Sequence, residues 1–320
     1  MRLLILGGSG FVGRVLAGEA VRRGDEVTVF NRGLREPPPG VRVLTGDRTA
    51  DLGALGDGAW DAVVDTWSGA GEVVRRTAQL LTGRAGVYQY VSSRSVYRWL
   101  GAAPLTEDAP LTDPAEPGYA GDKLRGEMAA EAFGGPVLLA RAGLILGPHE
   151  DVGRLPWWLT RLARGGPTLA PGPRDLPVQY IDARDLARFL LDAVPAGLTG
   201  PYNLVSRPGH TTTGELLDLA NEVTGGRAEL RWTDPAVIAA AGIEPWTQLP
   251  IWLPPGPDHD FMHGADVSKA LSAGLRARPV RETVEDTWAW LCSLPGDAPQ
   301  RADRTAAGLD PAVETKVLGE

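Results

Sequence analysis

The segment GGSGFVG, residues 7–13, constrains the fold of this chain more than any other part of the sequence. It follows the apolar run Arg2–Leu6, which is typical of a buried parallel strand. A strand, a glycine-rich turn and a helix in this order let backbone N–H groups approach a diphosphate at the positive end of the helix dipole. The alternative is a plain tight turn. The context predicts a dinucleotide-binding loop formed by Gly7, Gly10, Phe11, Val12 and Gly13.

Apolar runs and helical patterns alternate through the N-terminal part of the chain. Beyond the first strand, we expect strands at Glu26–Phe30, Val41–Asp47, Asp61–Thr66, Val87–Ser93 and Val178–Ile181. Helices are expected between them, notably over Gly71–Leu81 and from about Arg184. Strands that alternate with helices predict an α/β fold, a Rossmann-type doubly wound parallel sheet with a smaller, mostly C-terminal substrate-binding region.

The C-terminal part has fewer clear patterns. Thr212 fits the N-cap of a helix that runs to about Val223, and Arg281–Leu291 reads as an amphipathic helix. The Pro- and Trp-rich stretch Glu244–Gly264 is not expected to hold regular structure for long. Asp310, followed by proline, could begin a short terminal helix.

These patterns suggest a division of the chain into three parts. Residues 1–148 and 177–205 are expected to form the NAD(P)-binding Rossmann domain. Residues 149–176 and 206–295 are expected to form the substrate-binding region, and residues 296–320 a polar C-terminal tail.

Composition excludes several function classes. The 320 residues carry a net charge of −8, which argues against a general nucleic-acid or anionic-membrane binder. Cys292 is the only cysteine, so no disulfide framework or zinc cluster is expected, and the chain fits a reducing cytoplasm. The four histidines lack metal-motif spacing apart from a weak His259/His263 pair, so we expect no metal site. A small-molecule substrate remains as the expected partner.

The residues after the second expected strand bear on the choice of cofactor. An acidic side chain there would bind both ribose hydroxyls of NAD. This chain has Asn31-Arg32-Gly33 instead, so no carboxylate repels a 2′-phosphate and Arg32 can pair with it. NADP(H) is therefore favoured, with NAD(H) kept as the alternative. Asp47 is a candidate for the adenine edge and equally a turn residue.

Tyr119 and Lys123 lie four residues apart, on one face of an expected helix. A phenol has a pKa of about 10, which a neighbouring ammonium lowers toward the range of a proton relay. The segment VSSRSVY supplies Ser92, Ser93 and Ser95 near the carboxyl edge of the sheet, where ligands of such sheets bind. A hydroxyl there could polarise a substrate carbonyl oxygen.

Four segments now occur in a recognisable order: GGSGFVG, YVSSRSVY, YAGDK and VQYIDARDLA. With them the chain resembles the short-chain dehydrogenase/reductase superfamily, in its extended or atypical branch of NAD-dependent epimerase/dehydratase-like proteins. The resemblance covers about residues 1–205 and is looser beyond. It implies that Ser93 is the catalytic serine, that Tyr119 is the general acid/base and that Lys123 also holds the nicotinamide ribose. Family members often dimerise through helices of the Rossmann domain, so the resemblance is compatible with a homodimer, although the sequence does not fix the oligomeric state.

Three departures from the family pattern favour a less polar substrate. Trp67 stands where the family has small residues after the fourth strand. Leu144 ends the segment in which sugar-nucleotide epimerases carry a substrate-binding Asn, and it cannot make that hydrogen bond. Arg98 and Trp99 replace the usual glycine after Val-Tyr and give the site a bulky, charged rim.

Aromatic clusters with few polar groups suit a hydrophobic cleft, although core packing explains many tryptophans equally well. His259 and His263 fit surface or loop residues better than metal ligands. The candidates for substrate contacts are Trp67, Arg98, Trp157, His259 and Phe261.

Three functions are compatible with these features. The first is an NADP(H)-dependent oxidoreductase that moves hydride between the nicotinamide and a carbonyl or alcohol carbon of a small, partly hydrophobic metabolite. The second is an epimerase or dehydratase of sugar-nucleotide type that retains NAD and returns the hydride within one turnover. The third is a non-enzymatic dinucleotide-binding regulator, against which the intact Ser-Tyr-Lys set argues.

Overall fold

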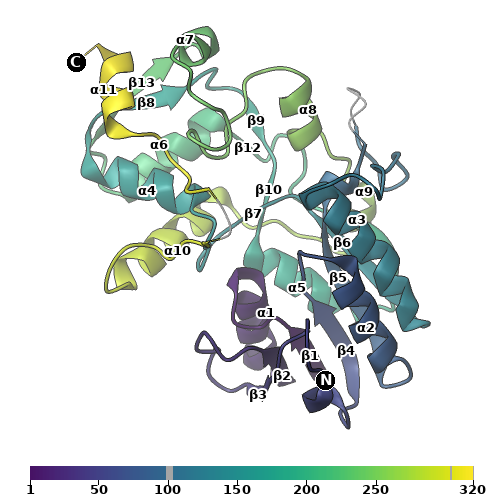
Figure 1. The fold of residues 1–320 in the computed structure, drawn as a ribbon. Helices are drawn as coiled ribbons and strands as arrows, with labels where there is room; N and C mark the ends of the chain where they lie inside the picture. Colours follow the sequence, from purple (N-terminus) through teal and green to yellow (C-terminus); the bar gives the residue numbers. More distant parts are fainter. Residues whose placement is uncertain (99–103, 303–304, 320) are drawn as a thin grey trace.

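A computed structural model of the protein describes residues 1–98, 104–302 and 305–319. A seven-stranded, wholly parallel sheet has the order β11-β6-β5-β4-β1-β2-β3 (Figure 1). Its strands are β1 (Arg2–Leu6), β2 (Glu26–Asn31), β3 (Arg42–Thr45), β4 (Trp60–Asp65), β5 (Ala85–Ser93), β6 (Val137–Ala142) and β11 (Gly200–Leu204). The strand order reverses at β1, so the crevice beside its carboxyl end is the expected ligand position of such a sheet.

Helices cover both faces of this sheet because its central strands are apolar on both sides. They are α1 (Phe11–Arg22), α2 (Gly71–Leu81), α3 (Tyr119–Ala130) and α5 (Ala183–Ala193). On one face, α1 and α5 pack through residues such as Leu16 and Leu190 onto Leu3. On the other, α2 and the segment after α3 pack through Val74 and Phe133.

The remaining helices and short strands form a second, C-terminal body with its own apolar core (Figure 1). Its helices are α4 (Arg154–Arg164), α6 (Thr213–Val223), α7 (Pro235–Ala240), α8 (Pro257–His263), α10 (Val280–Ser293) and α11 (Pro311–Leu318). A further short helix, α9 (Ser268–Ser272), packs beside β11. The short strands are β7 (Leu144–Leu146), β8 (Gly166–Pro171), β9 (Pro177–Val178), β10 (Tyr180–Asp182), β12 (Thr211–Thr212) and β13 (Ala228–Thr233). None of the helices in the described ranges combines the length and apolar character needed to cross a membrane.

The predicted α/β class and parallel sheet are confirmed, and most predicted elements lie within two residues of the observed ones. The helix over Gly71–Leu81 has the predicted bounds, and Thr212 caps α6 by accepting a hydrogen bond from Glu215 N at 3.1 Å. The strand predicted at Val178–Ile181 is instead broken into β9 and β10. The break lies at Gln179, whose N–H donates to the ring of His263 rather than to a neighbouring strand.

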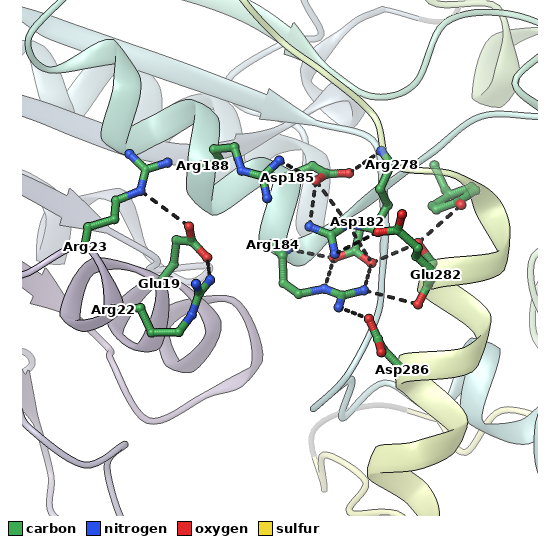
Figure 2. Close-up of polar contacts among 12 residues, drawn as sticks. Glu19, Arg22, Arg23, Asp182, Arg184, Asp185, Arg188, Arg278, Glu282 and Asp286 are labelled. Atoms are coloured by element: carbon green, nitrogen blue, oxygen red, sulfur yellow. Dashed lines mark hydrogen bonds and ion pairs between the residues drawn. The ribbon is translucent and has the colours of Figure 1, made fainter.

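Buried charges join the two bodies where α5 meets the start of α10 (Figure 2). Asp182 caps α5, binds the guanidinium of Arg184 and accepts a 2.9 Å hydrogen bond from the hydroxyl of Thr283. Asp185 accepts from the backbone N–H of Arg278 and from its guanidinium, both at 2.8 Å. Both aspartate side chains are 1% exposed or less, so their charges depend on these partners.

Replacing Arg278 by Met should therefore destabilise the protein. Breaking a buried pair leaves an uncompensated charge, and we expect a loss of about 3–5 kcal/mol in the free energy of unfolding. Arg281→Met is the matched control, because Arg281 is half exposed and pairs with Glu222 and Glu285 at the surface. Its loss should be much smaller, because ion pairs at the surface contribute little to stability. Urea unfolding measures the free energy of unfolding of both variants. Equal losses would show that the buried charges between α5 and α10 have no special role in stability.

Candidate active site

The glycine loop lies between β1 and α1, with its backbone packed closely on itself. Gly7 has φ +101°, and its N–H donates to Phe30 O at 3.0 Å. A Cβ on Gly13 would lie 2.4 Å from the carbonyl oxygen of Gly7, so only glycine allows this approach of helix and loop. A Cβ on Gly10 would meet nothing within 4 Å, and no side chain caps α1 at this position. This open space before uncapped N–H groups fits the diphosphate of a dinucleotide.

The end of β2 offers a second polar group to a ligand. The side-chain oxygen of Asn31 accepts a hydrogen bond from Gly33 N at 2.8 Å. The side-chain nitrogen of Asn31 is buried and has no hydrogen-bond partner among the described residues. Buried donors are rarely left unpaired, which favours a ligand atom at this position. The neighbouring Arg32 has an exposed side chain.

Asp47 follows β3, and its side chain stabilises the turn that begins at this residue. Its carboxylate accepts hydrogen bonds from the N–H and the hydroxyl of Thr49, at 2.8 and 2.7 Å. These bonds lower the pKa of Asp47, with a smaller contribution from the charge of Arg32. Asp47 therefore acts as a turn residue, which is one of the two alternatives that the sequence left open.

Ser93 and Tyr119 both lie at the carboxyl edge of the sheet. Ser93 is the last residue of β5, and its hydroxyl lies 3.1 Å from the hydroxyl of Ser95. Tyr119 is the first residue of α3, a helix that packs against β5 and against the 3-10 turn Arg94–Val96. The residue Tyr119 is 39% exposed, so it is accessible from solvent.

Lys123 lies one turn further along α3, with only 3% of the residue exposed. Its ammonium donates to the carbonyl oxygens of Trp67 and Val91, both at 2.7 Å. It also lies 4.9 Å from the ring centroid of Tyr90. Burial raises the pKa of Tyr90 well above its usual value, and the charges of Asp65 and Tyr119 add to the effect. Tyr90 is therefore a neighbour of both members of the Tyr119–Lys123 pair.

Trp67 follows β4 and is only partly buried. Its indole N–H donates to Ala70 O at 3.1 Å, and its backbone N–H donates to the carboxylate of Asp65 at 2.9 Å. The guanidinium of Arg48 lies 5.3 Å from the centroid of the indole. The sequence reading missed Asp65 and Arg48. The available signal was a carboxylate at the end of an otherwise apolar strand, in the segment DAVVDT.

The other predicted substrate contacts are spread over both bodies. The side chain of Arg98 is exposed, and Trp99 lies outside the described residues. Trp157 packs edge-on against Trp158, with ring centroids 4.7 Å apart, in the core of the C-terminal body. Phe261 lies on α8 and is partly buried.

His259 and His263 are buried in α8, so the expectation that they are surface or loop residues is wrong. A ring nitrogen of His259 lies 2.8 Å from Pro177 O, and His263 accepts a 3.0 Å hydrogen bond from Gln179 N. Burial, with the charges of His259 and Arg94, lowers the pKa of His263 to about 3, so its ring is a neutral acceptor. These partners are distant in sequence, and local pattern could not reveal them.

Arg94, the residue after Ser93, connects the end of β5 to α8. Its guanidinium donates to the carbonyl oxygens of Phe261 and Met262, both at 2.8 Å. Burial lowers the pKa of Arg94 to about 10. The side chain thus satisfies carbonyls at the C-terminal end of α8 and holds this helix beside the serine turn.

Leu144 is buried in β7 among the apolar residues of the C-terminal body. In the sequence this position suggested a missing polar contact to the substrate. Three residues earlier, Arg141 binds Glu127 of α3 through a guanidinium–carboxylate pair at 2.9 Å. Both side chains are 5% exposed or less. This part of the segment therefore braces α3 against β6.

Comparisons with known proteins agree with this arrangement. The sequence profile of the NAD dependent epimerase/dehydratase family matches residues 3–204. The chain is 28% identical to a UDP-glucose 4-epimerase of Corynebacterium glutamicum over 355 aligned positions, which cover 96% of this chain and 100% of the relative.

Solved structures show the same fold at lower identity. The Bordetella bronchiseptica enzyme WbmH, in complex with NAD+, has a TM-score of 0.70 at 20% identity and covers 92% of this chain and 99% of its own. The UDP-N-acetylglucosamine 4-epimerase of Methanobrevibacter ruminantium M1, in complex with UDP-N-acetylmuramic acid, has a TM-score of 0.70 at 16% identity. It covers 91% of this chain and 98% of its own.

Substitutions of Gly10, the N-cap of α1, and of Gly18, inside α1, test where the diphosphate binds. Gly10→Ala and Gly18→Ala both place a methyl group in open space, so neither should unfold the protein. Gly18→Ala in the helix interior should stabilise it by roughly 0.5–1 kcal/mol. Only Gly10→Ala should weaken NAD+ binding, by about tenfold or more, because its methyl group intrudes on the diphosphate. Calorimetric titration of the nucleotide-free proteins measures this, and equal affinities would contradict the assigned position.

Proposed function

Because the chain belongs to the NAD-dependent epimerase/dehydratase family, we propose that it epimerises or dehydrates a sugar nucleotide with an NAD that it retains through the turnover. The first substrate to consider is a UDP-hexose. Support comes from the UDP-glucose 4-epimerase relative, which aligns over nearly the whole of both chains. We further propose that residues 1–148 and 177–205 bind the cofactor, and that the substrate lies between them and residues 149–176 and 206–295.

The observation that carries this proposal is that the Ser-Tyr-Lys set and the glycine loop belong to the same edge of one parallel sheet. Ser93 ends β5, and Tyr119 and Lys123 lie in the first turns of the helix that packs on it. The glycine loop follows β1, and because β1, β4 and β5 run parallel, their carboxyl ends share one edge. Oxidation of an alcohol needs a hydride acceptor and a proton acceptor, and we propose that this edge provides for both.

Each residue has a distinct role in the proposed reaction. For epimerisation, a bound NAD would supply the acceptor for a hydride, which would return to the opposite face of the same carbon. Tyr119 takes the hydroxyl proton as the substrate is oxidised and gives a proton back as it is reduced. Ser93 donates a hydrogen bond to the substrate oxygen. Lys123 stabilises the phenolate of Tyr119 by its charge and holds the nicotinamide ribose.

An NADP(H)-dependent oxidoreductase is the second candidate, and one feature favours it. The end of β2 carries Asn31 and Arg32 without a carboxylate, so nothing repels a 2′-phosphate. The family relationship favours NAD instead, and the bound WbmH structure contains NAD+. The two candidates differ in whether the cofactor stays with the protein or exchanges at each turnover.

Tyr119→Phe should lower kcat for the proposed UDP-glucose/UDP-galactose interconversion by about 10²–10⁴-fold, the usual contribution of a general acid/base. Cofactor binding should stay nearly intact, because the ring remains and only the hydroxyl is lost. Tyr202→Phe is the matched control, since Tyr202 is buried in β11 among apolar residues. Full activity of Tyr119→Phe would refute the assigned role.

The nucleotide released from denatured protein identifies the cofactor. We expect NAD(H), present after purification and slow to exchange. Arg32→Ala should then change NAD(H) affinity little, because the exposed guanidinium has no 2′-phosphate to bind. A preference for NADPH over NADH of about tenfold, or 1.4 kcal/mol, that Arg32→Ala abolishes would instead support the oxidoreductase.

A further inference from the structure

An ion pair is buried beneath the carboxyl edge of the sheet, and none of the roles above uses it. Arg48 follows β3, and Asp65 is the last residue of β4. The guanidinium binds both carboxylate oxygens, with a distance of 2.7 Å between Nη2 and Oδ2. The side chains are 7% and 0% exposed. Tyr88 OH also donates to the carboxylate, and Arg48 donates a further hydrogen bond to the hydroxyl of Thr77 at 3.2 Å.

This pair is connected to Lys123 through a single residue, Trp67. Asp65 holds the backbone N–H of Trp67 at 2.9 Å, and Arg48 lies over its indole ring. The carbonyl oxygen of Trp67 then accepts the ammonium of Lys123 at 2.7 Å and the hydroxyl of Tyr90 at 3.0 Å. One residue, Trp67, therefore links the buried carboxylate to the buried ammonium, through its N–H on one side and its carbonyl on the other.

We propose that Arg48 and Asp65 are positioning residues, which fix the carbonyl of Trp67 and through it the ammonium of Lys123 beside Tyr119. The inference rests on the proposed function, because it assigns the pair a task in preparing that lysine. A hydrogen bond from an ammonium to a carbonyl depends steeply on distance and angle. The N–H and the carbonyl of Trp67 lie in adjacent peptide planes, so rotation within this residue would turn the carbonyl away from Lys123. Asp65 holds the N–H and Arg48 packs on the indole, and together these contacts limit that rotation.

The charges of Arg48 and Asp65 fit an ion pair that stays ionised and holds its neighbours in place, rather than a pair that exchanges protons. Burial acts to raise the pKa of Asp65, but its contacts with Arg48, Tyr88 and Trp67 outweigh burial and lower it. A buried ion pair is seldom the most stable filling for a core, and apolar replacements of similar volume are often tolerated. Its presence directly under the proposed site agrees with a role in placing atoms.

Two double variants separate the hydrogen bond from the charge. Arg48→Leu with Asp65→Asn keeps an oxygen that can accept from Trp67 N and from Tyr88 OH. Arg48→Leu with Asp65→Leu removes it. Both leave the net charge unchanged. A remote control is Arg161→Leu with Glu314→Leu, which removes a largely buried pair between α4 and α11.

The readout is the environment of the Lys123 ammonium, taken from its ¹⁵N NMR signal and assigned by its loss in the same protein carrying Lys123→Arg. In the Leu/Leu variant at 48 and 65 we expect this signal to shift or broaden, since an ammonium that loses a fixed acceptor samples more than one position. The Leu/Asn variant should keep most of the original signal, and the remote control should not differ from the unsubstituted protein. An unchanged Lys123 signal in a folded Leu/Leu variant would overturn the proposal.

Kinetics keep this inference distinct from the proposed function. With UDP-glucose and UDP-galactose, the Leu/Leu variant should lower kcat about tenfold with little change in KM, because substrate contacts remain. If no protein turns over these sugars while the Lys123 signal still changes, the proposed function fails and the positioning role stands. If the Leu/Leu variant does not fold, Arg48→Lys replaces it, since it keeps the charge but loses the planar fork. Arg48→Lys should also change the Lys123 signal, and an unchanged signal would overturn the proposal.

Discussion

The parallel pairing of β1 with β4 on one side and β2 on the other determines where the groups of the candidate site lie. Because all strands of the sheet run the same way, their carboxyl ends meet at one edge. The glycine loop, Asn31, Trp67 and Ser93 each end one of these strands or begin within two residues of its end. The site therefore needs no long-range loop to assemble it, and α3 adds Tyr119 and Lys123 by packing on β5.

The fold was predictable wherever a segment carries its own periodicity. Gly71–Leu81 has apolar residues at helical spacing and forms the predicted helix. β13 was missed because Ala228–Thr233 is half-exposed and is a strand only through its pairing with β8, sixty residues earlier. The buried positions of His259 and His263 were missed for the same reason, since Pro177 and Gln179 become their partners only in the folded chain.

Two predictions about the site show how single positions can mislead. Leu144 favoured a less polar substrate when it was read as a lost contact, yet its side chain belongs to the core of the C-terminal body. The family relationship now supports the sugar-nucleotide alternative better. Asp47 was considered for a ligand contact while the next residue, Arg48, was passed over. Nothing local distinguishes a buried arginine from a surface one, because its partner Asp65 lies on another strand.

The buried charges between α5 and α10 affect how the whole chain unfolds. If the C-terminal body opened alone, Asp185 would remain in the folded sheet domain without Arg278, and Asp182 would keep Arg184 but lose Thr283. The loss of these buried partners raises the free energy of that half-open state. Partly unfolded states are populated in proportion to their free energy, so this one should be rare. Two separate apolar cores are thereby joined into a single cooperative unit, which offers a protease few openings at the boundary between them.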